Sequence, residues 1–183
     1  MKKPSGVFRV NRYNPGTAGI FSRQSMKLTD ILKAEHIKVP LAATEKKAAI
    51  GELVQALAQS QDVKDSQLVL ASVLEREATR TTGVGHGLAI PHSKCSGVTR
   101  LTMAVGKPLQ PIDFESIDGQ PVFLIVLLVS PPEQTGAHIQ ALAKISRLMT
   151  IDHFRTTLRN AKTSAQVYDA IVAQEKTLAA ASG

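Results

Sequence analysis

The sequence has 183 residues, 43% of them hydrophobic, and a mean hydropathy of −0.01. These values are typical of one soluble globular domain with a sizeable core, and no apolar run approaches the ~20 residues of a membrane span. The one cysteine, Cys95, excludes an internal disulfide and agrees with a reducing, cytoplasmic location.

The net charge of +7 is distributed unevenly along the chain. Residues 1–25 contain five basic residues and no acidic residue, whereas the remainder contains 17 basic and 15 acidic residues. Residues 1–25 also lack an apolar period and a secretory core, so we expect them to form a disordered basic extension. Residues 26–183 then form one domain of nearly balanced charge, which argues against a nucleic-acid partner.

The first half of this domain combines helix and strand signals. We expect a helix over 30–36, a brief strand over 37–39 that Pro40 stops, a helix over 45–59 and a helix over 66–79. Thr29, Thr44 and Asp65 stand just before the three helices and are expected to cap them.

A glycine-rich segment comes next. Its Gly83, Gly85 and Gly87 can adopt positive φ and allow a ligand or a second backbone to approach closely. A proline then favours an extended backbone before it, so residues 88–90 are predicted to form a short strand that delivers His92. A histidine held in this way, beside a flexible loop, suits a group that a partner must reach.

The second half indicates an α/β fold. The apolar run over 122–130 is typical of a central strand buried on both faces, and such a strand requires helices above and below it. The other expected elements are a strand over 101–105, a turn at Asp118–Gly119, helices over 133–149 and 151–158, and a last helix from the cap Ser164 to about residue 178. The expected fold class is therefore α/β, with a mixed central sheet and helices on both faces.

His138 is expected on the inward side of the helix over 133–149, together with Ile139. Because this helix directly follows the central strand, its first turns should lie at the end of the sheet, where ligand sites gather in α/β folds. His138 and His92 would then share a site; the alternative is a packed histidine at the edge of the core. Arg76 is a candidate to reach His92, since a guanidinium fork matches phosphoryl oxygens.

The remaining histidines carry weaker signals. His36 and His153 lie near expected helix ends among polar residues, and we interpret both as solvated or capping. His86 lies about 20 Å from His92 if the segment between them is extended, and no third ligand has a recognisable spacing. A metal site is therefore not indicated.

Several kinds of catalysis lack their motif in this chain. Neither a G-x-S-x-G elbow nor a G-x(4)-G-K-[ST] phosphate loop is present, and Cys95 lies too near His92 on an extended segment for a dyad. A histidine that is itself the nucleophile remains, because a neutral imidazole reacts at cell pH without an added base. Phosphoryl transfer depends on positioning and charge stabilisation. Arg76 and a phosphoryl loop of Gly83, Gly85 and Gly87 would suffice for this, and no cofactor or metal is required.

The segment G-V-G-H-G-L-A-I-P-H, with Arg76-Glu77 before it, resembles the active-site segment of enzyme IIA domains of the fructose/mannitol class. These domains belong to the phosphoenolpyruvate-dependent sugar phosphotransferase system and include nitrogen-type regulatory IIA proteins. The resemblance extends from about Met26 to the C-terminus and implies a single IIA type 2 domain. It implies that His92 accepts a phosphoryl group from the phosphocarrier HPr or a nitrogen-type equivalent, with Arg76 and His138 in the same active site.

The resemblance leaves the output of the protein open. The first hypothesis is that the chain is a transporting member, in which the phosphoryl group passes to a cysteine of a IIB domain. Sugar selection would then lie in an associated membrane IIC permease. In regulatory members the phosphorylation state governs binding to target proteins. A third alternative is an interaction module that no longer accepts phosphate. His86 and the basic extension depart from the family pattern without disturbing the motif.

Overall fold

The computed structural model describes residues 26–181, so the expected disordered extension over 1–25 lies outside the described residues. The described part is a mixed α/β fold with a six-stranded sheet and five α-helices. The strands are β1 (Leu32–Leu41), β2 (Gly83–Gly85), β3 (Leu88–Ala89), β4 (His92–Lys94), β5 (Thr102–Pro108) and β6 (Leu124–Ser130). The helices are α1 (Lys46–Ala58), α2 (Ser66–Thr79), α3 (Thr135–Met149), α4 (Asp152–Asn160) and α5 (Ser164–Ala180), with short 3-10 turns η2 (Leu28–Asp30) and η3 (Pro132–Gln134).

Strand β6 is the centre of the fold. It pairs antiparallel with β5 and parallel with both β3 and β4, in the order β1-β5-β6-β3-β2. Every residue of β6 is buried, which confirms the predicted central strand. Its side chains alternate between two cores, because successive strand residues point to opposite faces.

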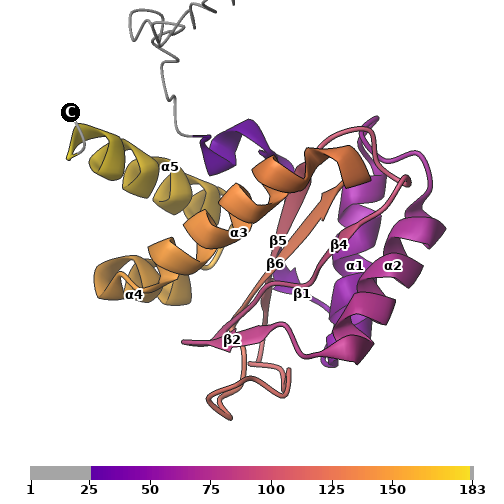
Figure 1. Ribbon diagram of the computed structural model, residues 1–183. Helices are drawn as coiled ribbons and strands as arrows, with labels where there is room; N and C mark the ends of the chain where they lie inside the picture. Colours follow the sequence, from indigo (N-terminus) through magenta and orange to yellow (C-terminus); the bar gives the residue numbers. More distant parts are fainter. Residues whose placement is uncertain (1–25, 182–183) are drawn as a thin grey trace, which may run out of the picture.

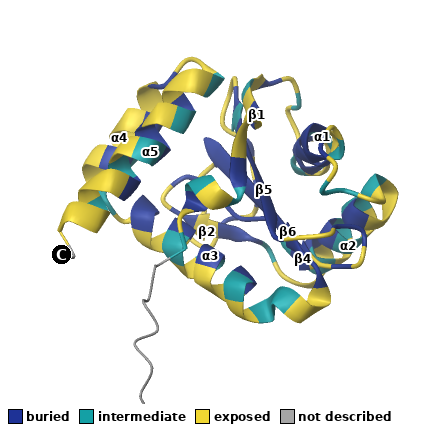
Figure 2. Cartoon of the chain, turned by 90° about the horizontal axis from the view of Figure 1, so that it is seen from above, coloured by how far each residue is buried: buried dark blue, intermediate teal, exposed yellow. Residues whose placement is uncertain are grey.

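Helices cover both faces of the sheet, as the apolar run over 122–130 requires. Helices α1 and α2 lie on one face, and α3, α4 and α5 lie on the other (Figure 1). Figure 2 shows the buried strands between these two layers, whose outer surfaces are exposed. The confirmed fold class is therefore α/β with a mixed sheet.

The expected helix over 30–36 is wrong, because Asp30 ends the 3-10 turn η2 and β1 begins at Leu32. Leu32 pairs with Met103 and Ile37 with Val105 of β5, and both β1 residues are buried in the core. The segment contains good helix formers, but burial against a strand distant in sequence overrides that local preference. Pro40 does not stop the strand either; β1 is an edge strand, where proline costs no ladder hydrogen bond.

The helix ends were predicted with mixed success. Asp65 caps α2 as expected, with its carboxylate accepting from the Leu68 N–H at 2.9 Å. Helix α1 begins after Glu45 instead of Thr44, without a side-chain cap, and Thr163 instead of Ser164 caps α5. Thr29 lies inside η2 and caps no α-helix. These errors are of one residue, except where the helix itself is replaced by β1.

Candidate functional site

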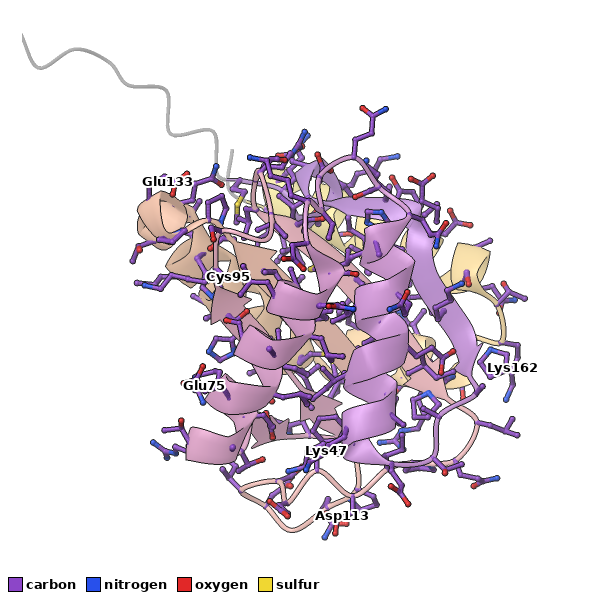
Figure 3. The ribbon with its side chains drawn as sticks, turned by 90° about the vertical axis from the view of Figure 1, so that its right-hand side faces the viewer. Lys47, Glu75, Cys95, Asp113, Glu133 and Lys162 are labelled. Atoms are coloured by element: carbon purple, nitrogen blue, oxygen red, sulfur yellow. The ribbon has the colours of Figure 1, made fainter. Side chains whose placement is uncertain are left out.

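An open cavity of about 490 Å³ lies beside β4, between α2 and α3. Its lining comes from three elements: Ser72, Glu75, Arg76 and Thr79 of α2, His92, Ser93 and Lys94 of β4, and Thr135, His138, Ile139 and Leu142 of α3. Figure 3 shows this side of the molecule, with Glu75 on α2 and Cys95 just beyond β4. The three side chains that the sequence singled out, Arg76, His92 and His138, are thus brought to one cavity.

His92 is the first residue of β4, and both its backbone and its ring are fixed by contacts. Its backbone pairs with Leu128 of β6, and its Nδ1 lies 2.7 Å from the carbonyl oxygen of Ile90. A carbonyl oxygen can only accept a hydrogen bond, so Nδ1 carries the proton. In the neutral ring this leaves the lone pair on Nε2. The half-buried ring is therefore a neutral imidazole with one defined nucleophilic nitrogen.

His138 stands in the first turns of α3 and is 3% exposed. Its ring centroid is 5.7 Å from that of His92, and the two ring planes are inclined by 58°. Its Nδ1 lies 2.8 Å from the Oγ of Ser130, the last residue of β6. Because only η3 separates β6 from α3, the first turn of α3 lies at the end of β6, and the ring of His138 lies beside that of His92. The predicted inward position of His138 is confirmed. Ile139, expected beside it in the core, is instead 60% exposed at the cavity.

Both rings are biased toward the neutral form. Burial lowers the pKa of His92, and the positive charge of Arg76 lowers it further, while the hydrogen bond to Ile90 and the carboxylate of Glu77 act in the opposite direction. Burial, with smaller effects of His92 and Lys94, lowers the pKa of His138 to about 4. Two adjacent neutral imidazoles at neutral pH suit nucleophilic attack and hydrogen bonding better than proton storage.

Two cations line the same cavity. Arg76, in the last turn of α2, donates from Nη1 to the carbonyl oxygen of Arg80 at 3.0 Å. Lys94 of β4 donates from Nζ to the Oγ1 of Thr135 at 3.2 Å. Lys94 was not among the predicted site residues, although its position two residues after His92 places both on one side of a strand. The cavity therefore presents positive charge from two elements beside a neutral nucleophile.

The three glycines are not among the residues that line the cavity. A Cβ on Gly83, Gly85 or Gly87 would approach Ser116, Asp118 or Phe123 more closely than ordinary contact. Gly85 and Gly87 also have φ values of +91° and +73°, where side chains are strained. The glycines are thus explained by packing of this hairpin against the segment 116–123, and their role as a phosphoryl loop stays a prediction.

His36 differs from its predicted solvated state. It lies in β1 with 0% exposure, and neither ring nitrogen has a hydrogen-bond partner. The sequence placed it at a helix end because the strand was missed. His153 is exposed on α4, and His86 is exposed with its backbone N–H donating to Asp118. Within residues 26–181, no group of three or more His, Cys, Asp or Glu side chains is placed to bind a metal ion.

Comparisons with known proteins identify the family of this chain. Residues 30–174 match the family model described as "Phosphoenolpyruvate-dependent sugar phosphotransferase system, EIIA 2". The chain is 34% identical over 154 residues to a nitrogen regulatory protein of Bradyrhizobium diazoefficiens, which covers 84% of this chain and 100% of that protein. It is 32% identical over 151 residues to the fructose-specific EIIABC component of Bacillus subtilis, which covers 82% of this chain but only 24% of that longer protein.

Solved structures share the fold. The nitrogen regulatory protein IIA-Ntr from Neisseria meningitidis aligns with a TM-score of 0.71 and 29% identity, over 78% of this chain and 97% of that one. The IIA domain in a complex of enzyme IIAMTL with phosphorylated enzyme IIBMTL from Escherichia coli aligns with a TM-score of 0.67, over 78% of this chain and 99% of that one. Its 17% identity supports a common fold alone. None of the helices described here is long and apolar enough to cross a membrane.

Proposed function

This chain belongs to the EIIA 2 family of the phosphoenolpyruvate-dependent sugar phosphotransferase system, and on that premise we propose that it is a phosphohistidine carrier. The proposed acceptor is Nε2 of His92, and the donor is HPr or a nitrogen-type equivalent. One observation carries the proposal: the bond from His92 Nδ1 to the Ile90 carbonyl, at 2.7 Å, leaves the lone pair of a neutral ring on Nε2.

The transfer needs no additional base. The Nε2 lone pair forms a bond to the phosphorus while the phosphorus–nitrogen bond of the donor breaks, and that electron pair returns to the histidine of the donor. The ring of His92 becomes a phosphorylated imidazolium that keeps its proton on Nδ1, and this N–H still donates to the Ile90 carbonyl oxygen. That carbonyl therefore stabilises the positive charge that develops on the ring during transfer.

The surrounding groups would stabilise the phosphoryl oxygens. Arg76 and Lys94 supply positive charge at the cavity, and a guanidinium can bind two oxygens at once. If the Ser130 hydroxyl donates to Nδ1 of His138, the Nε2–H of His138 is free to donate to a phosphoryl oxygen. Such fixed donors act mainly by positioning and charge stabilisation, which is what phosphoryl transfer requires.

Two outputs follow from the relatives. The first is transfer to a cysteine of a IIB domain for sugar uptake, supported by the fructose-specific EIIABC relative at 32% identity. The second is regulation through the phosphorylation state, supported by the nitrogen regulatory relative at 34% identity and the IIA-Ntr structure at 29%. A shared phosphohistidine step precedes both outputs.

The test is phosphoryl uptake from labelled phosphoenolpyruvate in the presence of enzyme I and either HPr or its nitrogen-type equivalent. We expect an acid-labile, base-stable phosphate on the wild-type chain and none on His92→Ala. Label at the normal rate on His92→Ala would overturn the proposal. Adding purified IIB domains to the phosphorylated chain then distinguishes the outputs, since only the transport output predicts loss of label to a IIB cysteine.

A further inference from the structure

Glu77, next to Arg76 in the last turn of α2, is an unusual carboxylate because it is 8% exposed. Its two oxygens accept hydrogen bonds from the backbone N–H of Thr82 at 3.2 Å, from the Thr82 hydroxyl at 2.5 Å and from Lys46 Nζ at 3.3 Å. A buried carboxylate is stable only when its lone pairs are occupied in this way. Glu77 thereby fixes Thr82 where the chain leaves α2.

Thr82 continues the connection toward the nucleophile. Its carbonyl oxygen accepts from the Ile90 N–H at 2.9 Å, and the Ile90 carbonyl oxygen accepts from His92 Nδ1 at 2.7 Å. Thr82 and Ile90 are both buried, so solvent does not compete for these bonds. Hydrogen bonds linked through the backbones of Thr82 and Ile90 therefore connect the carboxylate of Glu77 to the ring of His92.

We propose that Glu77 is a positioning residue that holds His92 in the Nδ1–H tautomer by fixing Thr82 and, through it, the Ile90 carbonyl. This inference deepens the proposed function, since it rests on Nε2 of His92 being the phosphoryl acceptor. Only the Nδ1–H tautomer leaves a lone pair on Nε2. A displaced Ile90 carbonyl would free the ring to rotate and to carry its proton on Nε2, where it blocks attack.

The electrostatics act in the same direction. The Glu77 carboxylate opposes the lowering of the His92 pKa by burial and by Arg76, so its field reaches the ring. A negative charge on this side of the ring also stabilises the imidazolium that forms on phosphorylation. Glu77 therefore acts on both the starting tautomer and the charged product without touching the phosphoryl group.

A purely structural role is the competing explanation, and the chain contains a matched control for it. Glu175 of α5 is 6% exposed and accepts from the N–H groups of Leu28 and Thr29, from the Thr29 hydroxyl and from Lys144 Nζ. It thus makes the same kinds of bond as Glu77, at η2 instead of at the approach to β4. In Glu77→Gln and Glu175→Gln alike, the amide NH₂ faces donors where an oxygen accepted before.

The experiment compares Glu77→Gln, Glu175→Gln and the wild-type chain by long-range ¹H–¹⁵N correlation spectra of ¹⁵N-histidine at neutral pH. We expect the wild type and Glu175→Gln to show the Nδ1–H tautomer of His92, and Glu77→Gln to show a large share of the Nε2–H tautomer. Thermal melts should show a similar loss of stability in both variants. An unchanged His92 tautomer in Glu77→Gln would overturn the proposal and leave Glu77 a structural residue.

Phosphoryl uptake gives the second readout. Glu77→Gln should be phosphorylated about tenfold more slowly than Glu175→Gln, the effect of one charge-assisted hydrogen bond. Equal rates in the two variants would contradict the proposal. If the wild type takes up no label, the phosphocarrier function fails, but the tautomer comparison still decides the role of Glu77. Thr82→Val is the substitute variant if Glu77→Gln does not fold. It keeps the backbone hydrogen bonds and removes only the bond from the Thr82 hydroxyl to Glu77, so it should give a smaller shift toward the Nε2–H tautomer.

Discussion

The two edges of the sheet carry histidines in opposite circumstances. His36 lies in the edge strand β1 with 0% exposure and no hydrogen bond to either ring nitrogen. His92 lies in β4, with Nδ1 bonded to a carbonyl and the ring open to a cavity. Burial is the largest cause of a lowered pKa for both rings. A lowered pKa alone therefore does not identify a site; a fixed tautomer, access and neighbouring cations distinguish the β4 edge.

The largest expected difference between the edges is in phosphoryl uptake. His92→Leu should take up no label, whereas His36→Leu should be phosphorylated at the wild-type rate. His36→Leu also removes two buried nitrogens that make no hydrogen bond, with the carboxylate of the exposed Glu35 3.9 Å from Nε2, so its free energy of unfolding should rise by about 1 kcal/mol. Uptake assays and urea titrations check both statements. Loss of uptake in a folded His36→Leu chain would show that the β1 edge takes part in the chemistry.

Arg76 provides a sharper test within the β4 edge. Arg76→Gln should lower the uptake rate about a hundredfold, the usual cost of removing one fixed donor to a developing charge. Arg80→Gln is the matched control, because Arg80 is exposed at the end of the same helix and its carbonyl, which Arg76 uses, is retained. Single-turnover rates at saturating donor measure the effect. Equal rates for the two variants would remove Arg76 from the site.

Replacing His138 should lower the rate of phosphoryl uptake somewhat less than replacing Arg76. His138 cannot easily be the acceptor, because it is 3% exposed on the inward side of α3. One charge-assisted hydrogen bond is worth about 1.5–3 kcal/mol, or about ten- to a hundredfold in rate. His138→Ala should therefore be phosphorylated more slowly, and onward transfer to an acceptor should suffer at least as much. Rapid-quench rates of both half-reactions decide this, and wild-type rates in both would make His138 a packed core residue.

Acid should destabilise the fold through these rings. The pKa of His138 is about 4 in the folded chain and 6.5 ordinarily, so between these values the unfolded chain binds more protons. The free energy of unfolding should thus fall as the pH decreases from about 6.5 toward 4, by at most about 3 kcal/mol for this ring. Urea titrations at pH 7 and 5 measure the fall. His138→Gln should show a smaller fall, and an unchanged slope would contradict this assignment.

Much of this comparison could be predicted from local sequence at the β4 edge and little of it at the β1 edge. The apolar run of β6 and the proline before His92 act on their own neighbouring residues. The predicted buried central strand and the predicted extended backbone at His92 are therefore both found in the structure. The partner of β1 is β5, which is distant in sequence, so no local pattern reveals that His36 is covered. Ile139 was misplaced because apolarity alone does not show that a helix flank faces a cavity.

The bond between Glu77 and Thr82 was equally hidden from the sequence. The glutamate was visible only as part of the Arg76-Glu77 pair, and its burial depends on how α2 ends against the strand that follows. Sequence patterns therefore identified three residues that line one cavity and that we propose to act in phosphoryl transfer, Arg76, His92 and His138. They did not identify the backbone carbonyl that selects the tautomer of His92, since any residue supplies a carbonyl.

The smallest expected effect concerns the extension over 1–25. A chain beginning at Met26 loses five basic residues but keeps the first contacts of the domain, including the bond from Lys144 Nζ to the Met26 carbonyl at 2.7 Å. Because residues 1–25 have no apolar period, they should add little to the core. The melting temperature and the uptake rate of this shortened chain should therefore equal those of the full chain.

A chain beginning at Ile31 is the control for this truncation. It also loses η2, in which Leu28 is 3% exposed. The N–H groups of Leu28 and Thr29 donate hydrogen bonds to the carboxylate of Glu175. The melting temperature of this chain should fall clearly, because a buried carboxylate then lacks most of its donors. A fall already in the chain from Met26 would show that the extension docks on the domain. Slower uptake only at low salt would instead show that its positive charge attracts an acidic donor protein, because charge steering weakens as salt rises.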